Sequence, residues 1–370
     1  MEKRDFRRNA KDMIYLTACV INNKVPDKER TAKMNIPQLF EVCQEHTMTA
    51  CTAYALESAG IRDHEFTQAK EKAIRKNILL DAERKKILAR LEKEKIWYMP
   101  LKGALLKDYY PKMGMRQMSD NDILCDGNFR KDIRKIMEEM GFTCVQYMDG
   151  KDDAYFKQPV YNFEMHSELV SRNAPHEMYD HYKNIKSKLI KDEGNDYGYH
   201  FSTEDFYVYL TAHEYQHFSH GGTGVRSLLD IYVMMQKFGK TLDRDYVDTE
   251  LERLGLAKFE RQGRELAAKL FGGGKLTENE QRELDCYIFS GTYGTFENDL
   301  DQKIENIGNG SKKRYVLRRI FPPMDHYKRW YPWAYKYKFL LPIAWLIRPI
   351  KGTAKHRKKL LSELRLLNKK

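Results

Sequence analysis

Two aspartates spaced one residue apart constrain this chain more than any other feature. They lie near the end of residues 99–125, which read MPLKGALLKDYYPKMGMRQMSDNDILC. Residues 119–125 are expected to form a strand, in which residues i and i+2 point to the same face. The carboxylates of Asp120 and Asp122 then project side by side, which suits a Mg²⁺ ion that also holds substrate phosphates. A solvated acidic turn is the alternative for this pair taken alone, because short acidic motifs are common.

A turn before the aspartates adds a candidate anion site. Residues 96–101 are apolar and aromatic, which indicates a buried strand that ends at Lys102-Gly103. Residues 103–110 are then expected to form a helix that begins at Gly103. A junction of this kind directs backbone N–H groups toward an anion such as a phosphate.

A third carboxylate follows further along the chain. Residues 160–169 are expected to form a strand, because polar and other side chains alternate along them. Glu164, His166 and Glu168 alternate with Met165, Ser167 and Leu169. If this strand pairs beside residues 119–125, Glu164 lies next to the two aspartates. The alternative is an ordinary polar face on a half-exposed strand.

Residues 203–239 are expected to form two helices separated by a glycine-rich break. The first runs to residue 220 and places His213 and His217 on one face, one turn apart. The second begins at residue 225 and carries Arg226 and Asp230, again four residues apart. These two side chains form either an ion pair within the helix or two groups that face a site.

The first of these helices contains the literal pattern HExxH in His213-Glu214-Tyr215-Gln216-His217. This pattern is typical of zinc hydrolases, in which the glutamate is the general base. A third ligand is needed, and the extended motif requires glycine at 220 and histidine at 223, where this chain has His220 and Thr223. We therefore interpret His213 and His217 as packed or site-lining residues, with a zinc hydrolase as the least favoured function.

The coarse pattern predicts an α+β fold with four parts. Residues 1–95 are expected to be a helical region, residues 96–170 an α/β core with a small mixed sheet, residues 171–310 a second helical domain, and residues 311–370 a basic aromatic tail. The net charge of +12 belongs to the tail, because residues 312–370 hold 18 Lys/Arg against 2 Asp/Glu. The charge therefore says little about the substrate of the core.

The tail mixes basic and aromatic residues. Residues 330–359 can lie on an anionic membrane surface, follow a nucleic-acid backbone, or pack on the body as a closing helix. Nothing in the pattern indicates recognition of a specific nucleic acid. No apolar run approaches the ~20 residues that a membrane span needs, and residues 1–20 lack a signal-peptide pattern. We therefore expect a cytoplasmic protein, with membrane association through the tail as the alternative.

The run LKGALLKDYYPKMGMRQMSDNDILC resembles the signature of an uncharacterised bacterial nucleotidyltransferase family of the polymerase-β-like superfamily. That signature continues with an acidic residue two positions before a histidine, as in Glu164-Met165-His166. A helical segment with paired histidines, a loop, then Arg and Asp also recurs, and it matches His213, His217, Arg226 and Asp230. The resemblance spans roughly residues 35–260.

The resemblance implies transfer of NMP from an NTP such as ATP to an acceptor of unknown identity. It implies that Asp120 and Asp122 bind the catalytic Mg²⁺, with Mn²⁺ as a substitute, and that Glu164 completes the ligand set and activates the attacking hydroxyl. Lys102 and Gly103 would then approach the nucleotide phosphates, and Arg116 would pair with them. His166, His213, His217, Arg226 and Asp230 are expected to line the site.

Three departures from the superfamily pattern define an alternative function. Ala104 follows Gly103 where glycine or serine is usual, Asn121 stands where an apolar residue is usual, and Glu164 replaces an aspartate. A catalytically weak nucleotide-binding or accessory protein on the same fold is therefore the second hypothesis.

Overall fold

The computed structural model describes residues 1–172, 174–219, 221–291, 300, 304, 311–345 and 347. The chain divides into two compact units. One consists of Met1–Gln216 with Thr223–Thr292, and the other of His217–Gly222 with Tyr293–Lys370. The four domain boundaries expected from the sequence remain a prediction.

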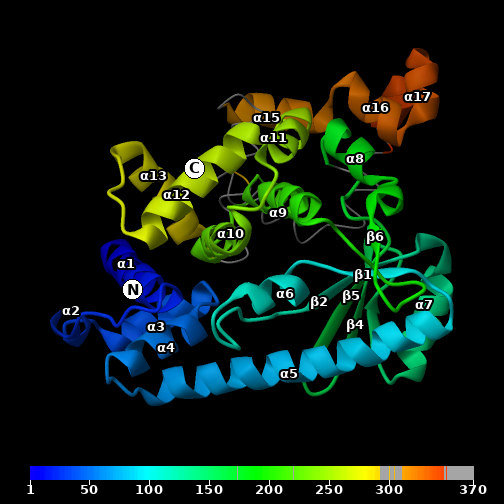
Figure 1. Cartoon of the computed structure of the whole chain (residues 1–370). Helices are drawn as coiled ribbons and strands as arrows, with labels where there is room; N and C mark the ends of the chain where they lie inside the picture. The colour runs from blue at the N-terminus through cyan, green and yellow to red at the C-terminus, as the bar shows by residue number, and fades with distance from the viewer. Residues whose placement is uncertain are drawn as a thin grey trace. The chain divides into compact units, whose positions relative to one another are not determined.

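A five-stranded mixed sheet lies in the first unit, in the order β1-β2-β5-β4-β3. β2 and β5 are parallel, and the other neighbouring strands are antiparallel. The strands are β1 (Tyr98–Pro100), β2 (Asn121–Cys125), β3 (Thr143–Gln146), β4 (Asp152–Lys157) and β5 (Tyr161–His166). Helices flank this sheet (Figure 1), which confirms the α+β class.

One face of the sheet packs on α5 (His64–Lys93) and α7 (Arg130–Glu139). The apolar stripe of α5, which includes Leu80, Ile87 and Leu91, is fully buried against Ile123 and Met165 of the sheet. Helical periodicity therefore places α5 on this face, as its spacing of apolar residues predicts.

The opposite face of the sheet meets α8 (His176–Tyr182) and α9 (Thr203–Phe218). Leu124 of β2 and Met99 of β1 join a core with residues of both helices, including Tyr182 and Tyr209. Because side chains alternate along a strand, Asp122 faces the same side as Leu124. The polar residues of the site therefore lie between the sheet and α9.

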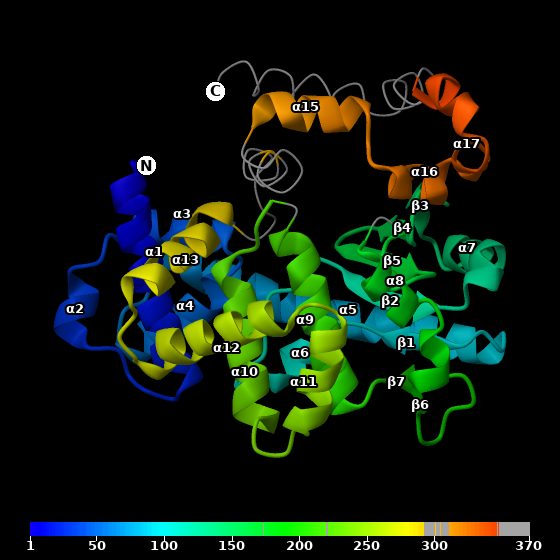
Figure 2. The ribbon, with the colours of Figure 1, turned by 90° about the horizontal axis from the view of Figure 1, so that it is seen from above.

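The N-terminal helices pack against helices from the C-terminal half of the same unit. α1 contacts α3 and α4 and also α12 and α13, and Figure 2 shows these helices side by side. The helices of this group are α1 (Lys3–Ile21), α2 (Lys28–Ala32), α3 (Ile36–Glu45), α4 (Thr49–Ser58), α10 (Val225–Phe238), α11 (Arg244–Arg253), α12 (Ala257–Gly272) and α13 (Glu278–Ser290). The two helical regions thus share a core, although the sheet separates them in sequence.

Two local features interrupt the expected helical regions. Within residues 1–95, Thr47 takes a positive φ of 53° and separates α3 from α4. A short hairpin of β6 (Ile190–Lys191) and β7 (Tyr199–His200) interrupts the helices of the C-terminal half. These strands are too short to produce a recognisable alternation.

The remaining elements are short. α6 (Gly103–Leu106) continues into the 3₁₀ turn Lys107–Tyr109, and further 3₁₀ turns cover Gly127–Phe129, Ile185–Lys188 and Lys338–Leu340. The second unit holds α15 (Lys312–Ile320), α16 (Met324–Trp330) and α17 (Pro332–Lys336). The tail beyond residue 347 lies outside the described residues. None of the helices in the described part of the chain is long and apolar enough to cross a membrane.

A buried histidine joins the two helical regions. His46 follows α3, is 0 % exposed, and its Nε2 lies 3.1 Å from the carbonyl oxygen of Ile288 in α13. Burial lowers the pKa of His46 to about 4, and the Arg226 charge acts in the same direction against the Ile288 hydrogen bond. The neutral ring is therefore part of the folded structure.

We expect His46 to make the fold sensitive to acid. The pKa of His46 is lower in the folded chain than in the unfolded one. Its contribution to the free energy of unfolding is therefore fully present above pH 6.5 and is lost as the pH falls toward 4. The full contribution is about 3 kcal/mol. Urea unfolding of the wild type and His46→Gln between pH 4 and 7 tests this, with the exposed His64→Gln as control. The dependence of the unfolding free energy on pH should flatten in His46→Gln alone, and an unchanged slope would contradict the prediction.

Candidate active site

The parallel pairing of β2 and β5 brings the predicted carboxylates together. Asp122 is the Cα partner of Glu164, and Leu124 is the partner of His166. Paired residues on neighbouring strands point to the same face, so Asp122, Glu164 and His166 share one side of the sheet. The strand pairing on which the role of Glu164 depends is therefore present.

These three side chains form a compact group of potential metal ligands. One ligand atom from each of Asp122, Glu164 and His166 lies within 4.8 Å of the other two. His166 Nε2 is 2.8 Å from Asp122 Oδ1 and 3.6 Å from Glu164 Oε2. On the other side of the ring, Lys151 Nζ is 3.2 Å from His166 Nδ1. Because an ammonium group can only donate, Nδ1 accepts from Lys151 and the Nε2–H donates to Asp122.

Lys102 lies directly beside this group. Its Nζ is 3.2 Å from Asp122 Oδ2, and both side chains are nearly buried. Burial alone would lower the pKa of Lys102, but Asp122, Tyr209 and Asp120 outweigh it and hold that pKa above its usual value. Lys102 precedes α6 with a φ of 44°, a conformation that side chains rarely adopt. Backbone strain of this kind costs about 1–3 kcal/mol and is concentrated at functional sites.

The two aspartates of the pair differ in their electrostatics. Burial together with the charges of Asp122 and Glu164 raises the pKa of Asp120 to about 6. Asp122 is also buried, which would raise its pKa, but Lys102 and His166 hold the pKa well below the usual value. Asp120 precedes β2 and lies outside the compact ligand group.

The residues present fit a divalent cation. The carboxylates of Asp120, Asp122 and Glu164 are close together and partly or fully buried, and burial followed by their mutual repulsion raises the pKa of Asp120. A bound cation would relieve this repulsion, and carboxylate oxygens are the ligands that Mg²⁺ prefers. Asp122 and Glu164 would hold it, with Asp120 close by. The identity of the metal stays a prediction.

Two further groups reach this site that the sequence did not indicate. Lys151 is largely buried, and its desolvation and the neighbouring Lys102 charge lower its pKa. Tyr209 of α9 is buried near Lys102 and Asp122, and its hydroxyl has no hydrogen-bond partner among the described residues. No local motif marks either residue, because each reaches the site through tertiary packing.

Arg116 is engaged by Asp230 in a buried bidentate pair. Its Nε is 2.9 Å from Asp230 Oδ1, and its Nη2 is 3.0 Å from Oδ2. The Tyr110 hydroxyl donates to the same carboxylate at 2.6 Å. The pair joins the loop before β2 to α10. The contact of Arg116 with nucleotide phosphates therefore stays a prediction, with its Nε and Nη2 already occupied.

Gly103 has a packing role beside this pair. A Cβ at Gly103 would lie 2.5 Å from Arg116 Nη1 and 2.8 Å from Met118 Sδ. Such distances are too short for carbon, so a larger residue would displace the guanidinium. The glycine after Lys102 is therefore needed for close approach, independently of any phosphate.

The other predicted residues are placed as follows. Arg226 Nη1 donates to Thr47 Oγ1 at 2.7 Å, so Arg226 and Asp230 each bind a partner outside their own helix. Arg226 Nη1 also donates to the backbone oxygen of Gln117 at 3.5 Å, which places Arg226 at the loop that precedes Asp120. The approach of His213 to the carboxylates stays a prediction. His217 belongs to the second unit.

The HExxH helix is not the part of the described chain where metal ligands gather. His213 Nδ1 is 3.8 Å from Glu214 Oε1, and Glu214 Oε2 accepts a hydrogen bond from Thr223 at 3.1 Å. Among the described residues, the side chains close enough to share an ion are those of Asp122, Glu164 and His166. The sheet and not this helix is therefore the candidate metal centre.

One family of known proteins matches the chain. The model of a family described as uncharacterised nucleotidyltransferase matches residues 32–272, which is more than half of the chain. The match includes every candidate residue of the site. No curated protein and no solved structure matches the chain.

The Arg116–Asp230 pair yields a stability prediction. Asp230→Ala leaves a buried guanidinium without its partner, so the free energy of unfolding should fall by about 3–5 kcal/mol. The double variant Arg116→Met/Asp230→Leu removes both charges and should recover a large part of this loss. Urea unfolding measures both changes, with Asp132→Ala on the exposed face of α7 as control. A double variant less stable than Asp230→Ala would contradict the account.

Proposed function

The chain belongs to the family of uncharacterised nucleotidyltransferases, and on this premise we propose that it transfers NMP from an NTP to an acceptor hydroxyl in a Mg²⁺-dependent reaction. The observation that carries the proposal is the register of β2 and β5, which aligns Asp122 with Glu164 beside Asp120. Carboxylates in this arrangement are suited to a metal–triphosphate complex.

The reaction forms one P–O bond and breaks another, and it moves one proton. The acceptor oxygen attacks the α-phosphorus of the NTP, and the bond from that phosphorus to the bridging oxygen breaks. Pyrophosphate leaves with the electron pair, and the proton of the acceptor hydroxyl passes to the Glu164 carboxylate. A bound Mg²⁺ supplies neutralisation of the phosphate charge.

The residues around the carboxylates would bind and orient the triphosphate. Lys102 is held by Asp122 at 3.2 Å and contributes a fixed positive charge. Arg226 and Lys76 add positive charge near Asp120. Lys151 and His166 fix the orientation of Asp122 through one hydrogen-bond chain. The chemistry thus depends on positioning and charge rather than on a covalent intermediate.

We expect the carboxylates to be essential for turnover. Asp120→Asn, Asp122→Asn and Glu164→Gln should each lower NTP-dependent pyrophosphate release by at least about 100-fold, because each loses charge at the metal and phosphates. The measurement is pyrophosphate release from each of the four NTPs with Mg²⁺ or Mn²⁺. Asp132→Asn, on α7 at the other face of the sheet, is the matched control.

Two outcomes would go against this proposal. Turnover that survives in Asp120→Asn/Asp122→Asn would place the chemistry elsewhere. Metal-dependent NTP binding without turnover in the wild type, lost in the same double variant, would instead favour the catalytically weak accessory protein.

We also propose that the tail contacts an anionic membrane surface. Its described part exposes large apolar side chains, with Phe339 77 % exposed and Trp333, Ile343 and Trp345 also exposed. Residues 312–370 hold 18 Lys/Arg against 2 Asp/Glu. Aromatic side chains among basic residues suit the interface of an anionic bilayer, because apolar burial and attraction to the lipid charges both favour binding there.

Liposome flotation tests the tail. Vesicles of phosphatidylglycerol and phosphatidylcholine should carry the wild type, and the triple variant Trp333→Ala/Phe339→Ala/Trp345→Ala should lower the bound fraction at least about tenfold through lost apolar burial. Val145→Ala/Met148→Ala, which removes exposed apolar groups elsewhere, is the control. Equal flotation of the triple variant and the wild type would remove the membrane from the proposal.

A further inference from the structure

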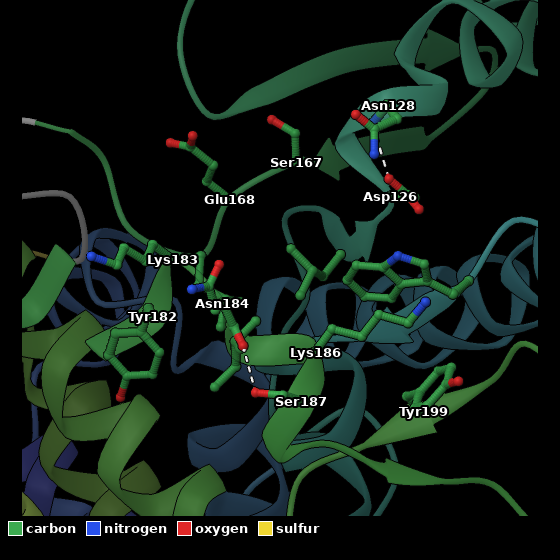
Figure 3. A pocket seen from close by; sticks show the side chains of 14 residues that line it. Asp126, Asn128, Ser167, Glu168, Tyr182, Lys183, Asn184, Lys186, Ser187 and Tyr199 are labelled. Atoms are coloured by element: carbon green, nitrogen blue, oxygen red, sulfur yellow. Dashed lines mark hydrogen bonds between the residues drawn. The ribbon is translucent and has the colours of Figure 1, made fainter. Parts of the chain in front are cut away.

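A pocket of about 620 Å³ lies at the end of β2 and β5, and the proposed transfer leaves it without a role. Figure 3 shows Asp126 and Asn128 on one side of the pocket, with Ser167 and Glu168 following β5. Residues 182–187 form the opposite wall. Its volume is in the range of pockets that enclose small molecules.

The pocket begins next to the carboxylates. Leu124 lines it and lies two residues after Asp122 on the same face of β2, and Ser167 directly follows His166. Strands rise about 3.3 Å per residue, so this wall starts about 7 Å along the strand from Asp122. A molecule in the pocket is within reach of the proposed reacting centre.

Charge separates this pocket from the phosphate end of the site. Lys76 donates to the backbone oxygen of Ser119 at 2.9 Å, so this cation, like Lys102, lies at the Asp120 end of β2. The pocket lies at the other end. An in-line transfer needs the acceptor and the leaving pyrophosphate on opposite sides of the α-phosphorus, and the pocket lies on the side away from the phosphate end, where an acceptor would enter.

The pocket itself is close to electrically neutral. Glu168 is paired with Arg172 at 3.1 Å, and Lys183 with Asp180 at 2.8 Å. The remaining charges are one carboxylate at Asp126 and one ammonium at Lys186. A strongly anionic or cationic ligand would therefore gain little here compared with water.

The uncharged lining combines aromatic rings with amides and hydroxyls. Trp97 and Tyr199 meet edge to face at 6.2 Å between ring centroids, and Asn128, Ser167 and Asn184 supply donors and acceptors. The exposed Lys186 ammonium lies over both rings, at 5.2 Å from the Trp97 centroid and 5.7 Å from the Tyr199 centroid, so a sugar would displace this side chain from the rings. Aromatic surfaces pack on the C–H faces of sugar rings, and amide and carboxylate groups pair with their hydroxyls. We propose that this pocket binds the acceptor of the transfer, and that the acceptor is a neutral carbohydrate whose hydroxyl receives the NMP. This inference rests on the proposed nucleotidyl transfer.

Saturation-transfer NMR on the full chain tests the pocket without requiring turnover. The probes are methyl α-glucopyranoside, methyl β-galactopyranoside, N-acetylglucosamine, maltose and trehalose. We expect saturation of at least one sugar by the wild type and an at least fivefold weaker effect with Asn184→Trp, which fills the pocket from an exposed position. Asn279→Trp, the same change at an exposed position of α13, should behave as the wild type. Trp97→Leu, which removes the aromatic surface, should also weaken the effect.

Binding of the four α,β-methylene NTPs with Mn²⁺ separates the two proposals. Asn184→Trp should bind its NTP analogue as the wild type does, and Asp120→Asn should lose that analogue while it still binds the sugar. The carbohydrate inference is overturned if no sugar is saturated, or if Asn184→Trp and Asn279→Trp saturate alike. It is equally overturned if Asn184→Trp weakens analogue binding tenfold, because the pocket then holds the nucleoside. Sugar binding without NTP binding in the wild type would sink the proposed transfer and keep the carbohydrate site.

Discussion

The parallel contact between β2 and β5 is the interaction on which the site depends. Its register sets Asp122 beside Glu164 and brings His166 to Asp122 at 2.8 Å. A shift of one residue would turn Glu164 and His166 to the other face, toward α5. The alternate residues of the two strands resist such a shift, because Ile123 of β2 and Met165 of β5 are buried against α5 and α7. Core packing on one face of the sheet therefore fixes the positions of Asp122, Glu164 and His166 on the other face.

A second buried interaction, the ion pair of Arg116 with Asp230, fixes the loop that leads to this site. Arg116 reaches Asp230 on α10 with two hydrogen bonds, and Gly103 is the residue that leaves room for the guanidinium. Because Gly103 follows Lys102 directly, the same packing restrains the lysine that pairs with Asp122. This ion pair thus joins α10 to the loop before β2, in addition to the apolar core that the sheet shares with α8 and α9, and its buried charges make it costly to break.

Much of this arrangement could be predicted from the sequence, for reasons that differ from residue to residue. Asp122 and Glu164 lie on short strands that the sequence indicated, whereas Asp120 lies just before β2 and not on the strand expected for residues 119–125. The pairing of these two strands could not be predicted from the sequence, because it depends on the register of β2 against β5. Lys151 and Tyr209 could not be foreseen, because a turn lysine and a helix tyrosine carry no pattern of their own. Asn121 breaks the apolar pattern, and the structure explains this through its hydrogen bond from Arg84 Nη1 at 2.8 Å.

The electrostatics of the first unit favour a role in binding over one in stability. Burial and two neighbouring carboxylates raise the pKa of Asp120, and Lys102 beside them holds a strained backbone conformation. Each feature opposes folding, whereas a buried apolar group of the same size would stabilise the chain. A fold that keeps both features gains from them only when a ligand of opposite charge arrives. The carboxylates would attract a cation, and the lysine would attract the phosphates that accompany it. The same residues that weaken the free protein are therefore those from which a metal–nucleotide complex would draw its binding energy.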